Sequence, residues 1–329
     1  MRHIRLLVVA ALAVSLLALG PPHAADAAGV RYRDEVFSQT TVTRRDVAYG
    51  SAINYKGQRE VLHLDVHEPK RDRAPVRAAV VWIHGGYFVR GDKAMTYYAD
   101  IVESLARAGY VTVSIDYRLD PTVPETLDQV VLTGQIDAFI DRARNAQHDA
   151  QAAIRWVRAH AEELRVDPDK VGVVGHSAGG LTSTMVAFND EDPGNSGNPG
   201  WSSRPTAAVS MAGGGLPFKT VDVDAGEPPF QAVEGLADTV VPAVGFAGPC
   251  AATIVMLNVC EMVLDPDQDH GTFGLPQIRD FLYRFVATSP PLRVPVNVTP
   301  VGVESLADPA ALQETVENLL GLLAGVTAT

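Results

Sequence analysis

The sequence contains little that would suit a metal-binding, nucleic-acid-binding or membrane-spanning protein. Only two of its 329 residues are cysteines, Cys250 and Cys260, and neither has the spaced cysteine or histidine partner of a metal site or a catalytic cysteine. Basic residues are scarce, since 27 Lys and Arg against 39 Asp and Glu give a net charge of −12, which opposes attraction to nucleic acid or anionic lipid. After the first twenty residues, no apolar run is long enough to cross a bilayer. We therefore expect no nucleic-acid partner and no membrane span.

The N-terminus has the layout of a secretory signal peptide. Arg2 and Arg5 precede an apolar stretch at 6–19, and small residues follow that stretch up to Ala27. The alternative is a membrane anchor, but the stretch is shorter than the roughly 20 apolar residues that an anchor needs. We expect residues 1–27 to be a signal peptide, cleaved near Ala27, and the mature protein to be secreted or extracytoplasmic.

Both cysteines lie in the part of the chain that is expected to be exported. An oxidising compartment favours a disulfide between Cys250 and Cys260. Two buried free thiols are the alternative, because the sequence does not show whether the two Cα atoms lie within bridging distance.

Length and composition predict one catalytic domain. A chain of 329 residues with 47% hydrophobic content can bury a single large core. We assign this domain to residues 28–286. Residues 287–329 have the prolines of an extended linker, followed by a C-terminal tail in which 309–326 shows the apolar spacing of an amphipathic helix.

Short apolar runs alternate with helical patterns along this domain, and this alternation is typical of an α/β fold with a mostly parallel central sheet and helices on both faces. Several runs are continuous and rich in β-branched residues, as expected for strands buried on both sides. The predicted strands are 60–67, 78–83, 110–115, 170–174, 207–211, 230–233 and 259–264, and the predicted helices are 97–108, 149–164, 178–188, 242–257 and 275–285.

Two stretches interrupt the alternation. Residues 120–147 contain helical segments beyond a plain crossover, and residues 189–204 are a loop rich in Gly, Pro, Asn and Asp. Ligands bind at the carboxyl ends of the strands in open α/β sheets, so insertions there would lie over a site. We interpret the two stretches as a lid, with surface decoration as the alternative.

The most specific motif is Gly-His-Ser-Ala-Gly at 175–179, directly after the apolar run at 171–174. A G-x-S-x-G sequence between a strand and a helix places its serine on a strained, sharp turn with the hydroxyl exposed. Ser177 is therefore the candidate nucleophile.

A serine nucleophile needs a base, and the sequence offers a single choice downstream. His270 is the only histidine after Ser177, and it follows the last predicted strand in a loop that continues with Gly271. In this arrangement the partners follow the serine in the order acid, then histidine. We predict that His270 is the base.

The acid has two candidates. Asp238 lies in the loop just after the strand at 230–233, where it can approach His270, and Glu234 lies at the end of that strand. We favour Asp238 as the acid, with Glu234 as the alternative.

Glycines upstream of the serine suit the stabilisation of an oxyanion. Gly85 and Gly86 follow the strand at 78–83 and expose backbone amides, which with the amide of Ala178 form a predicted oxyanion hole. The next residues, Tyr87 and Phe88, are candidates for the acyl pocket, although aromatic residues here are equally expected in the core.

These motifs together resemble those of α/β hydrolases of the carboxylesterase and lipase kind. The resemblance rests on His-Gly-Gly at 84–86, Asp-Tyr-Arg-Leu at 116–119, Gly-His-Ser-Ala-Gly-Gly at 175–180, and the pair Asp238 and His270. The stretch His-Gly-Gly-Tyr-Phe is more similar to bacterial feruloyl-esterase-like members than to the His-Gly-Gly-Gly of many hormone-sensitive-lipase-like relatives. Members also often have a histidine where this chain has Glu234, which keeps the alternative acid open.

The resemblance implies the hydrolysis of carboxylic esters with short or medium acyl groups through an acyl-enzyme, with Ser177 as nucleophile and His270 carrying the proton. It implies a small-molecule or polymer ester as substrate and no metal or organic cofactor. Two alternatives stay open: an amide-cleaving relative such as an acyl-peptidase or formamidase, and a non-catalytic binding protein on a hydrolase scaffold.

Overall fold

The computed structural model describes residues 29–189, 191–214, 221, 223–243, 250, 253, 256, 258–288 and 298–300. The predicted signal peptide, most of the predicted helix at 242–257 and the predicted tail helix at 309–326 lie outside these residues. No helix among the described residues is long and apolar enough to cross a membrane.

The described residues form one nine-stranded sheet with the strand order β1-β2-β4-β3-β5-β6-β7-β8-β9. β1, β2 and β4 pair antiparallel, and all the other neighbours pair parallel, so the predicted mostly parallel sheet is confirmed. The strands are β1 Thr40–Ile53, β2 Arg59–Pro69, β3 Arg77–Ile83, β4 Val111–Ile115, β5 Val166–His176, β6 Ala208–Met211, β7 Phe230–Gly235, β8 Cys260–Asp265 and β9 Val298–Pro300.

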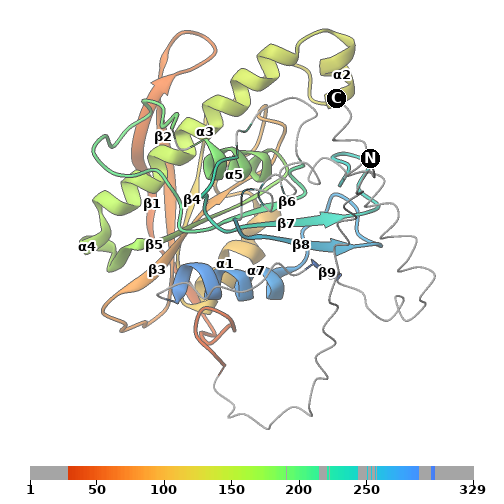
Figure 1. Ribbon diagram of the computed structural model, residues 1–329. Helices are drawn as coiled ribbons and strands as arrows, with labels where there is room; N and C mark the ends of the chain where they lie inside the picture. Colours follow the sequence, from red (N-terminus) through yellow and green to blue (C-terminus); the bar gives the residue numbers. More distant parts are fainter. Residues whose placement is uncertain are drawn as a thin grey trace, which may run out of the picture.

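Helices cover both faces of the sheet, with α3 and α5 above it and α1 and α7 below it in Figure 1. Alternate residues of β3 point to opposite faces of the sheet. Val81 belongs to the core layer on the side of α3 and α5, whereas Val80 and Trp82 belong to the layer on the side of α1 and α7. This two-sided burial explains why the central strands are continuous apolar runs. The helical elements are η1 Thr96–Tyr98, α1 Ala99–Ala108, α2 Leu127–Leu132, α3 Ile136–Ala159, α4 Ala161–Leu164, α5 Ala178–Phe188, α7 Leu275–Leu282 and the π-helical η2 Tyr283–Ala287.

The structure corrects three boundaries. β1 has no counterpart among the predicted strands, because its register shifts against β2 break the period-two alternation that marks a strand. α3 begins at Ile136, well before the predicted start at 149, so it takes in the end of the first insertion. The predicted strand at 170–174 is longer in the structure, because β5 spans Val166–His176 and includes the Asp-Pro-Asp sequence at 167–169.

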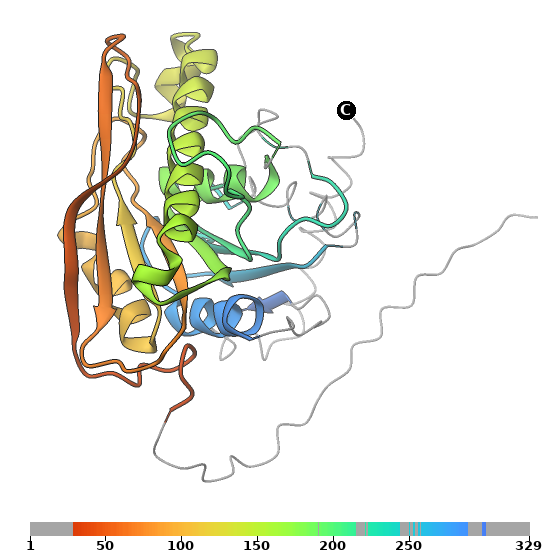
Figure 2. The ribbon, with the colours of Figure 1, turned by 90° about the vertical axis from the view of Figure 1, so that its left-hand side faces the viewer.

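The loop at 189–204 does not lie where it was predicted. It begins at the far end of α5, whose 11 residues span about 16 Å, whereas Ser177 precedes the first residue of that helix. Arg155 and Arg158 of α3 donate hydrogen bonds to four carbonyl groups of the loop, and in Figure 2 the loop (green) crosses in front of α3. This segment therefore covers α3, and the interpretation of it as a lid over Ser177 is wrong.

The other insertion, at 120–147, borders the predicted oxyanion stretch. Phe139 packs edge-on against Phe88 with ring centroids 5.6 Å apart. Arg142 donates a hydrogen bond of 3.4 Å to the carbonyl of Tyr87. Residues 120–147 therefore contact the predicted oxyanion stretch, and their role in shaping access to the site stays a prediction.

Candidate active site

Ser177 occupies the sharp turn between β5 and α5. Its backbone has φ 57° and ψ −122°, a conformation that costs a non-glycine residue free energy and is typical of functional sites. Glycine is required on both sides of Ser177 because the neighbouring backbone is very close. A Cβ atom at Gly175 would lie 2.1 Å from the carbonyl oxygen of Gly179, and a Cβ atom at Gly179 would lie 2.1 Å from the carbonyl oxygen of Ile83. The helix can therefore start directly beside β3 only with glycine at these positions.

The structure brings Ser177, His270 and Asp238 together in one chain of hydrogen bonds. His270 lies between β8 and α7, and its Nε2 is 2.8 Å from Ser177 Oγ. Its Nδ1 is 2.7 Å from Asp238 Oδ2. A carboxylate can only accept, so Nδ1 carries the hydrogen and Nε2 is free to accept the serine proton. The arrangement can perform nucleophilic attack with general-base assistance.

Asp238 is itself held in place by the turn that follows β7. Its Oδ1 accepts hydrogen bonds of 2.8 and 2.9 Å from the backbone amides of Val240 and Val241. The side chain has no exposed surface. Both oxygens of the carboxylate are therefore used, one for orientation and one for His270.

Glu234, the alternative acid, is fully buried in β7 and makes no hydrogen bond to His270 among the described residues. Burial, and to a smaller degree the charge of Asp238, raise the pKa of its carboxyl well above the ordinary value. The geometry therefore favours Asp238 over Glu234 as the residue that orients His270.

The three predicted oxyanion donors are not equivalent. The amide of Gly85 donates a hydrogen bond of 3.2 Å to the hydroxyl of Tyr98 and is thereby occupied. The amides of Gly86 and Ala178 have no hydrogen-bond acceptor within the described part of the chain. Ala178 is the first residue of α5, where backbone amides lack intrahelical partners. Gly86 and Ala178 therefore remain candidate donors, and Gly85 does not.

The two aromatic residues after the glycines have different positions. Phe88 is fully buried and packs on Phe139 and Tyr117, so it has the position of a core residue, which was the alternative to a place in the acyl pocket. Tyr87 is only partly buried and remains a candidate for the pocket. Both have positive φ, 58° and 65°, so the chain turns in a left-handed conformation directly beside the candidate oxyanion hole.

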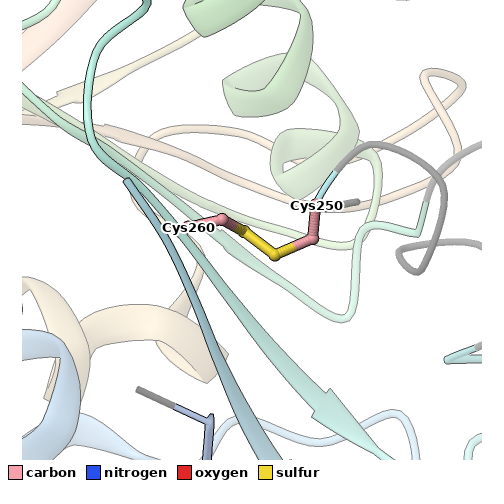
Figure 3. Close-up of a disulfide and its surroundings, with 2 residues drawn as sticks. All are labelled: Cys250 and Cys260. Carbon is pink, nitrogen blue, oxygen red and sulfur yellow. A yellow bond between two sulfur atoms is a disulfide. The ribbon is translucent and has the colours of Figure 1, made fainter. Parts of the chain in front are cut away.

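Two further sequence features prove structural. Arg118 of the Asp-Tyr-Arg-Leu motif forms a buried ion pair with Asp149 of α3, with 2.8 Å between Nη2 and Oδ1. Cys250 and Cys260 form the predicted disulfide, with Cα atoms 5.6 Å apart (Figure 3). The bond anchors Cys250 to the first residue of β8, the strand that leads to His270.

The described residues contain no group of three or more His, Cys, Asp and Glu side chains that could hold a metal ion. The sheet order and the position of Ser177 between β5 and α5 are those of the α/β-hydrolase fold. The model of the carboxylesterase family matches residues 35–193 of this chain.

Two relatives come from Mycobacterium tuberculosis. The probable carboxylic ester hydrolase LipM is 30% identical over 152 residues, which are 45% of this chain and 30% of LipM. The carboxylesterase NlhH is 36% identical over 129 residues, 38% of this chain and 32% of NlhH. The alignments thus span about a third of the length of these relatives.

Among solved structures, the chain is similar to Thermogutta terrifontis esterase 2 phosphoramylated by tabun. The TM-score is 0.57 at 25% identity, and the match covers 74% of this chain and 96% of the esterase. The matched part of the fold includes nearly all of that esterase.

Proposed function

We propose that the protein is a serine hydrolase that cleaves carboxylic esters through an acyl-enzyme. The observation that carries the proposal is the hydrogen-bonded chain from Ser177 to His270 to Asp238, on a strained turn beside two unoccupied backbone amides. The carboxylesterase family match and the esterase relatives support an ester as the substrate.

The chemistry follows from the geometry. Ser177 Oγ attacks the ester carbonyl carbon while its proton passes to His270 Nε2, and Asp238 stabilises the imidazolium that forms. The amides of Gly86 and Ala178 stabilise the oxyanion of the tetrahedral intermediate. Collapse of this intermediate breaks the bond to the alcohol, which leaves with the proton from His270. Water, deprotonated by His270, then attacks the acyl-serine, and collapse releases the acid and returns the proton to Ser177.

A substrate panel tests this proposal. We expect turnover of a p-nitrophenyl ester series from acetate to octanoate, with a maximum at short or medium acyl length. The comparison panel contains peptide anilides and formyl amides, which an amide-cleaving relative would hydrolyse with comparable kcat/KM. Preference for the amides would refute ester hydrolysis as the function, and no turnover of either panel would favour a binding role.

We also propose that the mature protein works outside the cytoplasm. The buried disulfide supports this, because such bonds persist in oxidising compartments. The charged and apolar pattern of residues 1–27 supports it as well. Fractionation of cells expressing the full chain, with N-terminal sequencing of the exported material, is the test. Protein that stays in the cytoplasm with residues 1–27 attached would contradict the proposal.

A further inference from the structure

Three loops of the candidate active site are joined by a second chain of hydrogen bonds, which runs through Tyr98 and His176. The Gly85 amide donates to Tyr98 Oη at 3.2 Å. The same Tyr98 oxygen is 3.0 Å from His176 Nδ1. The other ring nitrogen of His176, Nε2, is 3.2 Å from the carbonyl oxygen of Gly271.

The direction of every bond in this chain is fixed. The carbonyl of Gly271 can only accept, so His176 Nε2 carries the hydrogen and Nδ1 is an acceptor. Tyr98 must therefore donate its hydroxyl proton to Nδ1, and its oxygen accepts from the Gly85 amide. Every donor in this chain therefore has an acceptor within the chain, and no water is needed to complete it.

The surroundings keep this arrangement neutral and rigid. Tyr98 and His176 are both almost fully buried. Burial, followed by the nearby charge of His270, lowers the pKa of His176 to about 4, against smaller opposing effects of the backbone at Gly271 and His270 and of the charge of Asp238. The ring of Tyr98 packs on that of Trp82 in β3, with 5.3 Å between the ring centroids, and Tyr98 is also the N-cap residue of α1. A strand and a helix therefore hold its hydroxyl in place.

Each anchored residue is a direct neighbour of a residue with a proposed role in the reaction. Gly85 precedes the oxyanion donor Gly86, His176 precedes the nucleophile, and Gly271 follows His270. The contact is also close: a Cβ at Gly85 would lie 2.5 Å from Tyr98 Oη. A side chain there would therefore displace the hydroxyl.

We propose that Tyr98 and His176 are positioning residues that fix the oxyanion loop, the nucleophile turn and the His270 loop at their mutual distances. This inference rests on the proposed ester hydrolysis. The hydrogen bonds of these two side chains do not involve Ser177 Oγ or the ring nitrogens of His270, although the His176 ring packs with its centroid 5.1 Å from that of His270. Their effect is on the alignment of the reacting groups, and misplacement by about 1 Å can lower a rate about 100-fold.

The test compares two tyrosine variants that each lose one hydroxyl. Tyr98→Phe keeps the ring contacts with Trp82 and His176 but removes both hydrogen bonds of the hydroxyl. We expect kcat on p-nitrophenyl butyrate to fall about tenfold or more with KM within about twofold, because alignment is lost and substrate binding is not. Tyr97→Phe is the matched control, since Tyr97 is the exposed neighbour and its hydroxyl makes no hydrogen bond in the described structure. Its kcat should equal that of the wild type.

A second variant separates positioning from folding. His176→Leu removes the Nδ1 acceptor of the Tyr98 hydroxyl, together with the N–H that is donated to Gly271. We expect it to lower kcat as well, and the double variant with Tyr98→Phe should lose less than the product of the two single effects, since both remove the same bond. Rates are expressed per active site titrated with an organophosphate, so that unfolded protein does not count.

These experiments distinguish failure of the positioning role from failure of the proposed ester hydrolysis. Absence of ester turnover in the wild type would refute the function itself. Wild-type turnover with an unchanged kcat in Tyr98→Phe would overturn the positioning role alone. A rise in KM at constant kcat, or fully multiplicative effects in the double variant, would also overturn it.

Discussion

The two halves of the candidate active site are held in different ways. The nucleophile and the oxyanion loop extend from β5 and β3, which pair directly through Ile83 and Gly175 in the centre of the sheet. Asp238 and His270 instead lie on loops after β7 and β8, farther toward one side of the sheet, where side-chain hydrogen bonds orient them. The first half stores backbone strain at Ser177, whereas the second depends on polar contacts. The comparison indicates that a short stretch of sequence specifies the nucleophile turn of the first half. The second half forms because β7 and β8, which are separate in the sequence, are neighbours in the sheet.

Ser177→Ala should have the largest effect, because it removes the nucleophile of the central half. We expect kcat for p-nitrophenyl butyrate to fall by about 10⁶-fold, with the loss measured by steady-state kinetics on purified protein. Denaturant unfolding of the variant serves as the control for folding. Retention of a few per cent of the wild-type rate would assign the chemistry to another group.

Asp238→Asn should have the next largest effect, about 10⁴-fold on kcat, since the amide would no longer hold His270 in the required tautomer. Glu234→Gln is the matched control in the same half of the site. Its carboxyl makes no hydrogen bond to His270 among the described residues, and burial and the charge of Asp238 raise its pKa and so favour the protonated form, so we expect kcat within about threefold of the wild type at pH 7. A larger loss in Glu234→Gln than in Asp238→Asn would reverse the assignment of the acid.

His176 links the two halves, and its titration should appear in the stability of the protein. Burial lowers the pKa of the folded-state imidazole to about 4, below the ordinary value near 6.5, so the unfolded chain binds more protons between these pH values. The free energy of unfolding should therefore fall by about 3 kcal/mol from this group as the pH drops from about 6.5 to 4. Urea unfolding across this range should show a shallower fall in His176→Gln. Parallel curves for the two proteins would contradict the expectation.

The disulfide reinforces only the second half, where it anchors Cys250 to β8. Replacing both Cys250 and Cys260 with alanine should lower the free energy of unfolding by about 2 to 3 kcal/mol, as expected for a short closed loop. Reduction of the wild type should have the same effect on urea unfolding, and reductant should leave the variant unchanged. Equal stability of the oxidised wild type and the variant would show that the bond contributes nothing.

The sequence predicted the central half well because its signals are local. The strand at 171–174, the turn and the helix after it are contiguous, so Ser177 could be assigned from a short window. His270 was predictable for a different reason, namely that no other histidine follows Ser177. The sequence favoured Asp238 but left Glu234 open as the alternative acid, because both lie near the end of β7 and the direction of the side chains is not visible in the sequence.

Features that depend on contacts through space were not predictable. Tyr98 reaches the site from the start of α1, and nothing in its local sequence shows that its hydroxyl meets His176. The occupied amide of Gly85 follows from the same contact. The loop at 189–204 was misplaced because its composition shows that it is a loop but not which part of the molecule it covers.

The most direct test of the central claim is covalent labelling of the serine. Thermogutta terrifontis esterase 2, to which this chain is similar, has been solved as a phosphoramylated form. Incubation of the protein with diisopropyl fluorophosphate, followed by peptide mass spectrometry, should give one adduct per chain on Ser177 and a parallel loss of ester turnover. His270→Ala should show much slower labelling. Complete loss of turnover with Ser177 unlabelled, or full turnover after Ser177 is labelled, would contradict a mechanism through this serine.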